Sequence, residues 1–454
     1  MIVSSVQDSE KHDNRRILAV DFVRGIAIFG VLFIHPMIYG TWQTEENALN
    51  IVPFRIVVLF LPIIIMGTWG GGFLMISSLV HTYNTHHRLA RGYSMKKIFG
   101  PILTTSTLLF FIDPLKAILF DRTWTNAYSK GYNSSILSHL LEQGTLAWPS
   151  PEKIFQIGIL PAIGINGYVT CLLLWLLLRN NGGKKLRRNI TVLLVLGIAM
   201  SLISNPVNQL MNPYVKMLYE KAGIYRFFAY LLRFFFGAQL SYFPMGVYGI
   251  FGLAAGLLVA NHAPLATIKR FGVGLGSLYL VAFVISLIMT ITSASNAEDA
   301  IFGILDYEIY PRELLFISLG CMFLLLYWLL KRYEYIDDDL RVKRARRTLF
   351  FRRFGVATLT LYILEPVFNG IIARIFHVIF GGASSEFGTP DPFMTNVWAI
   401  LLYVATFEVF WIVFVYFWAR SGYKYGVEYW IVKSGKNRRE IKSKRLQLET
   451  YDSG

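Results

Sequence analysis

Three ionisable residues share one apolar stretch near the start of the chain, VDFVRGIAIFGVLFIHPMIYG: they are Asp21, Arg24 and His35. Ionisable groups are costly at membrane depth and usually face a cavity or the pathway of a substrate, ion or proton. At about 100° per residue, Arg24 and His35 return to nearly the same face of a helix, and Asp21 lies one turn before Arg24 on that face. The stretch therefore predicts a polar stripe along a membrane helix.

This stripe covers a large part of the membrane thickness. With a rise of about 1.5 Å per residue, His35 stands about 16 Å further along the helix than Arg24, so a site here could contact both compartments. The structural alternative is an i, i+3 pair of Asp21 and snorkelling Arg24, with His35 as a hydrogen-bonded residue before a kink at Pro36. For three such groups on one face, we favour a functional site.

Two carboxylates fall inside later apolar stretches. Glu365 is followed by Pro366 and Asn369, so its helix backbone is interrupted, and Glu408 lies in the middle of the last apolar stretch. Buried carboxylates need partners. Either residue could hold His35 in one tautomer, bind a coupling ion in a transporter, or make a structural hydrogen bond between helices.

The composition indicates that membrane helices position these residues. Of 454 residues, 54% are hydrophobic and 16% are charged, and the mean hydropathy is +0.47. Soluble domains are less apolar and more charged. We expect an all-α, polytopic membrane protein with about ten transmembrane helices. The predicted spans are 17–40, 52–79, 98–120, 154–178, 190–210, 241–260, 273–291, 314–330, 356–380 and 397–418.

The connections between these spans alternate in charge, as the positive-inside rule requires. Basic residues gather after the second, fourth and eighth spans and at the sixth, whereas the connections at 41–50, 295–310 and 382–392 are neutral or acidic. The connection at 121–153 is mixed in charge and is placed outside by alternation alone. Both termini are then expected in the cytoplasm.

The chain divides into a cytoplasmic N-terminal segment (1–16), a single transmembrane helical domain (17–432) and a charged cytoplasmic tail (433–454). The first segment lacks the apolar core and cleavage site of a signal peptide, so we expect the first helix to direct insertion. The expected location is the cell membrane, crossed several times.

Three further stretches have weaker signals. The aromatic stretch 225–240 suits an interfacial or re-entrant position better than an eleventh span. The glycine-rich stretch 67–78 favours close helix packing over a tunnel for a pantetheine arm. The stretch SNPVNQLMNP, residues 204–213, is typical of a helix end at the outer face, where its amides would cap a loop or, less readily, contact a sugar.

The opening helix also carries a family resemblance. Residues 16–35, RILAVDFVRGIAIFGVLFIH, resemble the first helix of the transmembrane acyltransferase superfamily, which includes the YeiB-like proteins and heparan-α-glucosaminide N-acetyltransferase and whose members begin on an Asp-x-x-Arg-Gly helix. The spacing of Arg24 and His35 is similar to that of the related acyltransferase-3 membrane family. Little between residues 84 and 357 is distinctive.

Two stretches near the C-terminus extend the resemblance. TLTLYILEP, from Thr358, resembles the Leu-Thr-Asn-Tyr-Leu-Leu-Gln helix of YeiB-like proteins, and YGVEYWIVK, from Tyr425, resembles their closing Gly-Pro-Leu-Glu-Trp motif. The chain departs from this pattern at several positions. His35 stands where YeiB-like members usually carry Asn, Leu361 replaces an Asn, Glu365 replaces a Gln, and the closing motif lacks its Pro and one residue.

The resemblance implies acyl transfer, commonly of acetyl from cytoplasmic acetyl-CoA to a sugar hydroxyl or amine reached from the other side. It implies His35 as the base that takes the acceptor proton, or as a transient acyl carrier. From its place in a span, Glu365 is the catalytic carboxylate that we expect behind His35. Arg24 would bind the donor phosphates and Asp21 would orient Arg24. Further donor-binding cations are expected at Arg88, Arg91 and Lys97.

The expected partners are membrane lipid, acetyl-CoA or another acyl-CoA as donor, and a glycan or glycolipid acceptor. A transporter or flippase is the alternative, with Asp21, Arg24, His35 and Glu365 as a proton or substrate relay. The net charge of +16 suits cytoplasmic loops and lipid headgroups, so we expect no nucleic acid. The sequence leaves a homo-oligomer open.

No metal is expected in this chain. Three histidines in one basic loop, His81, His86 and His87, mimic a metal cluster. No acid or cysteine lies near them in the sequence to complete a set of ligands.

Overall fold

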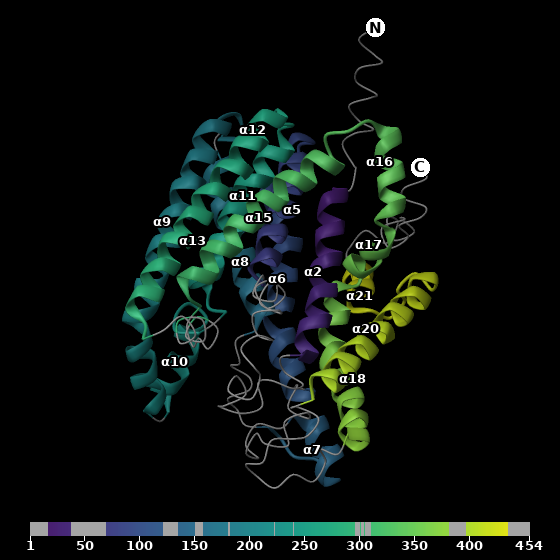
Figure 1. The fold of residues 1–454 in the computed structure, drawn as a ribbon. Helices are drawn as coiled ribbons and strands as arrows, with labels where there is room; N and C mark the ends of the chain where they lie inside the picture. The colour runs from purple at the N-terminus through teal and green to yellow at the C-terminus, as the bar shows by residue number, and fades with distance from the viewer. Residues whose placement is uncertain are drawn as a thin grey trace.

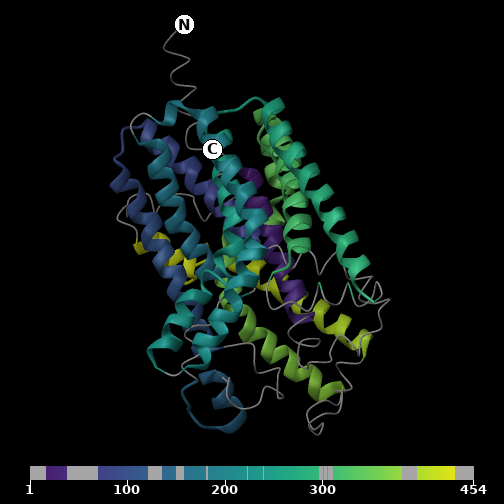
Figure 2. The ribbon, with the colours of Figure 1, turned by 90° about the vertical axis from the view of Figure 1, so that its left-hand side faces the viewer.

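The computed structural model describes residues 17–37, 70–120, 135–149, 158–179, 182–221, 223–238, 240–295, 300, 304, 310–380 and 396–434. Every regular element within these ranges is a helix (Figures 1 and 2). Nine helical stretches there are long and apolar enough to cross a membrane. The chain is therefore an all-α polytopic membrane protein, as its composition predicts.

The long helices are α2 (Leu18–Met37), α5 (Gly70–Ala90), α6 (Met95–Leu119), α8 (Ile159–Leu178), α9 (Leu186–Glu220), α11 (Tyr242–Ala260), α13 (Leu275–Ser293), α15 (Arg312–Tyr333), α18 (Thr358–Phe380) and α20 (Val397–Arg420). The shorter ones are α7 (Ile136–Gln143), η4 (Gly182–Lys184), α10 (Ile224–Arg233), α12 (Leu265–Lys269), η5 (Arg270–Gly274), α16 (Asp338–Arg347), α17 (Leu349–Val356) and α21 (Val427–Ser434). Helices α12, η5 and α13 form one continuous stretch of spanning length. The predicted span 52–79 lies largely outside the described residues, as do the segment 1–16 and nearly all of the tail.

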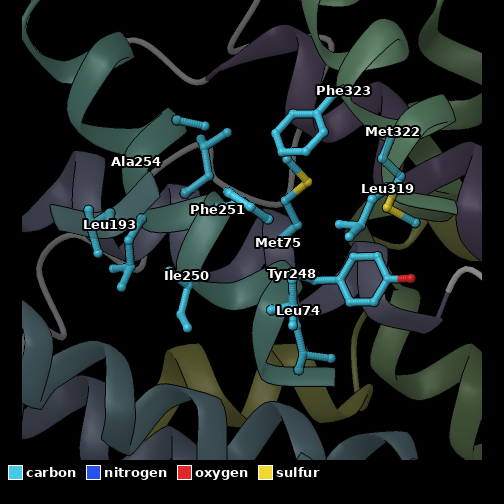
Figure 3. Close-up of a cluster of buried hydrophobic side chains, with 14 of the residues drawn as sticks. Leu74, Met75, Leu193, Tyr248, Ile250, Phe251, Ala254, Leu319, Met322 and Phe323 are labelled. Carbon is cyan, nitrogen blue, oxygen red and sulfur yellow. The ribbon is translucent and has the colours of Figure 1, made fainter. Parts of the chain in front are cut away.

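Helix α11 lies at the centre of the larger group of helices. In its most apolar window 89% of the residues are buried, against 28% for α9 and for the stretch that includes α13. Figure 3 shows part of its packing: Tyr248 and Phe251 of α11 lie among side chains of α5 and α15. The exposed apolar side chains of α9 and α13 are consistent with lipid contact, because lipid replaces water as their neighbour.

Glycines allow α5 and α11 to approach closely. A Cβ at Gly71 would overlap the Tyr248 ring, and one at Gly252 would overlap the backbone of Met75. The part of the glycine-rich stretch that the structure describes therefore serves helix packing, which confirms the structural interpretation of that part.

A second apolar cluster joins α2 to α17, α18 and α20. It contains Ile28 and Leu32 of α2, Phe354 of α17, Leu361 of α18 and Trp411 of α20. Figure 1 shows α2 between these helices and the larger group, and the first turn of α2 packs into the core of the larger group. The helix that carries the predicted polar stripe is thus in contact with both parts of the molecule.

The structure describes two of the stretches with weaker sequence signals, 204–213 and most of 225–240. The prediction of a helix end at 204–213 is wrong, because α9 continues to Glu220 through Pro206 and Pro213. Membrane helices tolerate proline when neighbours satisfy the freed backbone groups. Helix α10, with ten residues, is too short to cross the membrane, which agrees with the absence of a span at 225–240.

Basic stretches gather at one end of the helix bundle. Helices α12 and α16, which carry the basic stretches IKR and RVKRARR, lie at one end, and α7 and α10 lie at the other (Figure 1). The ring of His87, at the end of α5, lies 6.3 Å from the ring of His262, just before α12, so the basic turn after α5 belongs to the same end. We call this the basic end.

Candidate functional site

His35 and Glu365 meet between α2 and α18. His35 Nδ1 lies 3.3 Å from Glu365 Oε2. The glutamate side chain is fully buried and the histidine side chain is 15% exposed. Two residues that are 330 positions apart in the chain and that the sequence nominates for catalysis are therefore in direct contact.

Hydrogen bonds extend this contact into α20. Asn369 Nδ2 donates to Glu365 Oε1 over 3.1 Å, and the hydroxyl of Tyr403 donates to Asn369 Oδ1. All three partners of this extension are buried. One carboxylate oxygen thus faces the imidazole while the other is fixed by an amide, which holds the carboxylate in orientation behind the histidine.

Both helices are interrupted by proline at this contact. Pro36 follows His35 directly, and Pro366 follows Glu365 directly. A proline within a helix lacks the N–H that would bond to the carbonyl four residues earlier. The backbone on both sides of the pair is therefore locally freed from helical hydrogen bonding, which lets helices bend at the site.

A second buried ion pair lies close to the histidine. On α6, Lys116 Nζ lies 2.9 Å from Asp113 Oδ1, and both side chains are less than 10% exposed. Lys116 Nζ also lies 4.2 Å from the centre of the Tyr362 ring, which is in turn 6.4 Å from the His35 ring. Sequence reasoning missed this pair, although an acid and a lysine three residues apart in a predicted span were a usable signal.

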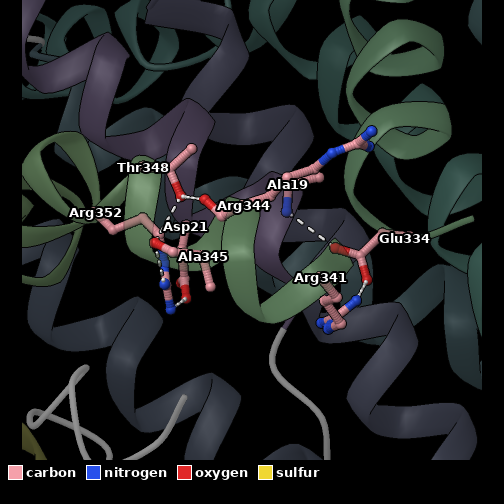
Figure 4. Close-up of polar contacts among 8 residues, drawn as sticks. All are labelled: Ala19, Asp21, Glu334, Arg341, Arg344, Ala345, Thr348 and Arg352. Carbon is pink, nitrogen blue, oxygen red and sulfur yellow. Dashed lines mark hydrogen bonds and ion pairs between the residues drawn. The ribbon is translucent and has the colours of Figure 1, made fainter. Parts of the chain in front are cut away.

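Asp21 contacts a residue that sequence reasoning did not single out. Arg352 Nη2 of α17 lies 3.9 Å from Asp21 Oδ2, and the Arg352 side chain is 1% exposed. Its Nη1 also donates to the carbonyl of Ala345 (Figure 4). Because Asp21 precedes His35 by fourteen residues, the two lie about 21 Å apart along α2. The ion pair of Asp21 with Arg352 thus tethers α2 to α17 at a distance from His35.

A neighbouring cluster fixes the first turn of α2 (Figure 4). Glu334 Oε1 accepts from the backbone N–H of Ala19 over 3.0 Å, and Glu334 Oε2 pairs with Arg341 at 2.6 Å. Burial raises the pKa of the Glu334 carboxyl, and Arg341 opposes that rise. The carboxylate caps the positive end of the helix, so α2 is anchored at the basic end.

The four predicted donor cations occupy two places. Arg24 is half-buried on α2, one turn after Asp21, while Arg88, Arg91 and Lys97 are exposed around the turn between α5 and α6. Both places belong to the half of the molecule nearer the basic end. The cations therefore lie on the side where the sequence expects a cytoplasmic donor, on separate helices.

Glu408 is a buried acid outside this network. It is 6% exposed on α20, and its two carboxylate oxygens have no hydrogen-bond partner among the described residues. The indole nitrogen of Trp411, one turn further on, is likewise unsatisfied within that part of the chain. A buried carboxylate without a partner is costly when charged.

The two C-terminal stretches that resemble family motifs contact each other. Glu428 Oε1 accepts from the backbone N–H groups of Leu359 and Thr360, at 2.5 and 3.0 Å, and Thr360 Oγ1 accepts from the N–H of Val427 at 2.7 Å. Glu428 thus caps the N-terminus of α18, the helix that positions Glu365.

The histidines at the end of α5 contact one another and nearby rings. His87 lies 4.3 Å from the ring of Tyr83 and 6.0 Å from that of His86, measured between ring centres. Within the described ranges, no group of three or more His, Cys, Asp or Glu side chains is arranged to hold a metal ion.

The structure thus brings together His35 and Glu365 and places Asn369, Tyr403, Tyr362 and the Lys116–Asp113 pair around them. Asp21 lies beside Arg352, further along α2. We call the group formed by His35, Glu365, Asn369 and Tyr403 the His–Glu network. The chain matches no protein-family model, and a search of curated proteins finds no significant relative.

Proposed function

We propose that the chain is a membrane-embedded acyltransferase of the cell membrane, which moves acetyl or another acyl group from cytoplasmic acyl-CoA to a sugar or glycolipid on the outer side. The observation that carries the proposal is the 3.3 Å contact of His35 Nδ1 with Glu365 Oε2. A proton on Nδ1 directed at the carboxylate leaves the lone pair on Nε2, where it can accept a proton from a substrate.

In the proposed reaction, His35 Nε2 takes the proton of an acceptor hydroxyl or amine while the acceptor atom attacks the thioester carbonyl carbon. The new C–O or C–N bond forms, the C–S bond breaks, and the CoA thiolate leaves with the electron pair. The proton on Nε2 then passes to that thiolate. In the carrier variant, Nε2 attacks the thioester first and the acyl-imidazole is then opened by the acceptor. Glu365 stabilises the positive charge that His35 gains in either route.

The basic end supports a donor site for CoA phosphates. Arg24 is half-buried on the same helix as His35, and Arg88, Arg91 and Lys97 are exposed at this end. Guanidinium and ammonium groups are the usual partners of phosphate. The buried Lys116, paired with Asp113, lies beside Tyr362, whose ring in turn lies 6.4 Å from that of His35.

Donor binding is the first test of this proposal. Purified protein in detergent, titrated with acetyl-CoA, should bind saturably, and Arg24→Gln should weaken the binding by tenfold or more, about 1.5 to 3 kcal/mol for a hydrogen bond to a charged group. Arg187→Gln is the matched control, because Arg187 is an exposed arginine of α9 outside the proposed site. A wild-type protein that shows no saturable binding would contradict the proposed donor site. Equal acetyl-CoA binding by Arg24→Gln and Arg187→Gln would contradict it as well.

A proton-coupled transporter or flippase is the second candidate, and Glu408 favours it. A buried carboxyl without a partner among the described residues can take up and release a proton as the helices move. In proteoliposomes, this candidate predicts that wild-type protein dissipates a pH gradient when its substrate is present and that Glu408→Gln abolishes this flux. The acyltransferase proposal predicts that Glu408→Gln leaves acyl transfer within about twofold of wild type, because Glu408 is outside the His–Glu network.

A further inference from the structure

A shallow groove runs between α17 and α20 on the surface of the molecule. It has a volume of about 250 Å³ and is lined by Phe350 and Phe354 of α17 and by Ile412, Val413, Tyr416 and Phe417 of α20. Val413 is 48% exposed and Phe417 is 61% exposed, so the groove opens outward and is separate from the buried His–Glu network. Its apolar lining suits a hydrocarbon chain.

Two arginines lie beside the ring of Tyr416, which lines this groove. Arg353, which also lines the groove, has its guanidinium carbon 5.5 Å from the centre of the Tyr416 ring. The guanidinium carbon of Arg420 lies 4.5 Å from the same centre, and Arg420 Nη2 donates to the Tyr416 hydroxyl. The described lining residues include no acid. An apolar groove with two cations at its edge is complementary to a ligand with an anionic head and an apolar tail.

The residues that follow α20 in the chain are of types typical of the membrane interface. Tyr425 is 80% exposed and Trp430 is 50% exposed, and both follow closely on Arg420, the last residue of α20. Exposed tyrosine and tryptophan gather at the level of lipid headgroups. Positive side chains at that level attract anionic lipids.

We infer that this groove binds an anionic phospholipid. The phosphate lies against Arg353 and Arg420, and one acyl chain lies along Phe350, Phe354, Val413 and Phe417. The lipid bridges α17, which is tethered to α2 through the Arg352–Asp21 pair, and α20, which contributes Tyr403 to the His–Glu network. The inference stands independently of the proposed acyl transfer.

Lipid retention by the full-length protein tests the inference. Protein in detergent is incubated with equal amounts of phosphatidylglycerol and phosphatidylcholine that carry the same acyl chains, and bound lipids are counted by native mass spectrometry. We expect phosphatidylglycerol to be retained in preference. The double variant Arg353→Gln/Arg420→Gln should lower its retention by about tenfold.

A matched control separates the groove from general attraction to a basic surface. Arg346→Gln/Arg347→Gln removes the same charge from exposed positions of α16, outside the groove, and should change retention by less than about twofold. Equal losses in the two double variants would overturn the inference. So would full displacement of the lipid by millimolar glycerol phosphate, which would indicate a site for free phosphate.

Val413→Trp tests the part of the groove that would hold the acyl chain and leaves both arginines unchanged. Because Val413 is half-exposed, the larger ring can fill the groove without disturbing the core. We expect retention of phosphatidylglycerol to fall by about fivefold or more, since the excluded chain contributes about 0.8 kcal/mol per buried methylene. Unchanged retention of phosphatidylglycerol in this variant would contradict the proposed acyl-chain site, even if the arginine variant failed to fold.

Discussion

At the scale of single residues, the contact of His35 with Glu365 joins two departures from the family resemblance. YeiB-like proteins usually carry Asn and Gln at these two positions, and two amides can share a hydrogen bond but cannot exchange a proton. Histidine and glutamate can, because the imidazole titrates near neutral pH. In this chain the pair combines a titratable imidazole with a carboxylate, the two groups that the proposed proton transfer needs.

Glu365→Gln is the isosteric test of this contact. The amide can offer a donor to Nδ1, which favours the tautomer with its proton on Nε2 and removes the base. We expect acyl transfer to fall by about 10² to 10⁴ while acetyl-CoA binding and thermal unfolding stay near wild type. The double variant His35→Asn/Glu365→Gln should lose no more acyl-transfer activity than Glu365→Gln alone, because the two residues act as a unit.

Activity that persists in Glu365→Gln would mean that the carboxylate does not position the histidine. The pH dependence of the rate supplies a readout that a purely structural role would not move. If Glu365 acts through His35, the variant should change the pH profile of the remaining rate, whereas a loss of packing would lower the rate equally at all pH values.

At the scale of helices, the crossing of α2 and α17 depends on two glycines. A Cβ at Gly25 would overlap the carbonyl oxygen of Phe351, and one at Gly355 would meet the backbone carbonyl of Asp21. Neither contact can be relieved by a side-chain rotation, because both overlapping atoms belong to the backbone. The crossing thereby sets how closely Asp21 approaches Arg352.

Gly25→Ala should therefore destabilise the protein by about 1 to 3 kcal/mol, the usual cost of overpacking. Gly30→Ala, on the same helix, is its control, because a Cβ at Gly30 meets nothing within 4 Å. Thermal unfolding in detergent measures both. Equal midpoints for the two variants would show that the helices separate easily and that the crossing is not fixed by these glycines.

The cap on α18 is a second prediction at this scale. Glu428→Ala removes the acceptor for two backbone N–H groups and should cost about 1 to 2 kcal/mol of stability, typical of a lost N-terminal cap. Glu428→Gln keeps an acceptor oxygen and should cost less. The same unfolding measurement applies, and a loss in Glu428→Gln as large as that in Glu428→Ala would argue against the cap.

At the scale of the whole molecule, the alternation of basic and acidic connections in the sequence predicts its orientation. Tags after Lys185 and at the C-terminus should be cytoplasmic, and tags near Glu45 and Asn296 should be external, because basic connections remain inside. Protease protection of the tags in sealed vesicles measures this. Placement of the tags at Glu45 and Lys185 on the same side would contradict the expected topology.

The sequence predicted the membrane helices well because their length and apolar composition are local properties. It failed at 204–213, where proline and asparagine indicate a helix end in water but are accommodated inside α9. It singled out His35 and Glu365 through their cost at membrane depth, and the structure places the two in contact. It did not find Arg352, Tyr403 or the capping role of Glu428, since each acts through a residue at least 34 positions away.

Acyl transfer by His35 variants tests the proposed role of His35 most directly. Purified protein receives radiolabelled acetyl-CoA and glucosamine, which offers both an amine and hydroxyls, and labelled product and free CoA thiol are measured together. If His35 handles the proton, His35→Ala should bind acetyl-CoA normally but transfer the acetyl group about 10² to 10⁴ times more slowly, and His35→Asn should be equally impaired. Transfer by His35→Asn at the wild-type rate would contradict the claim that His35 handles the proton.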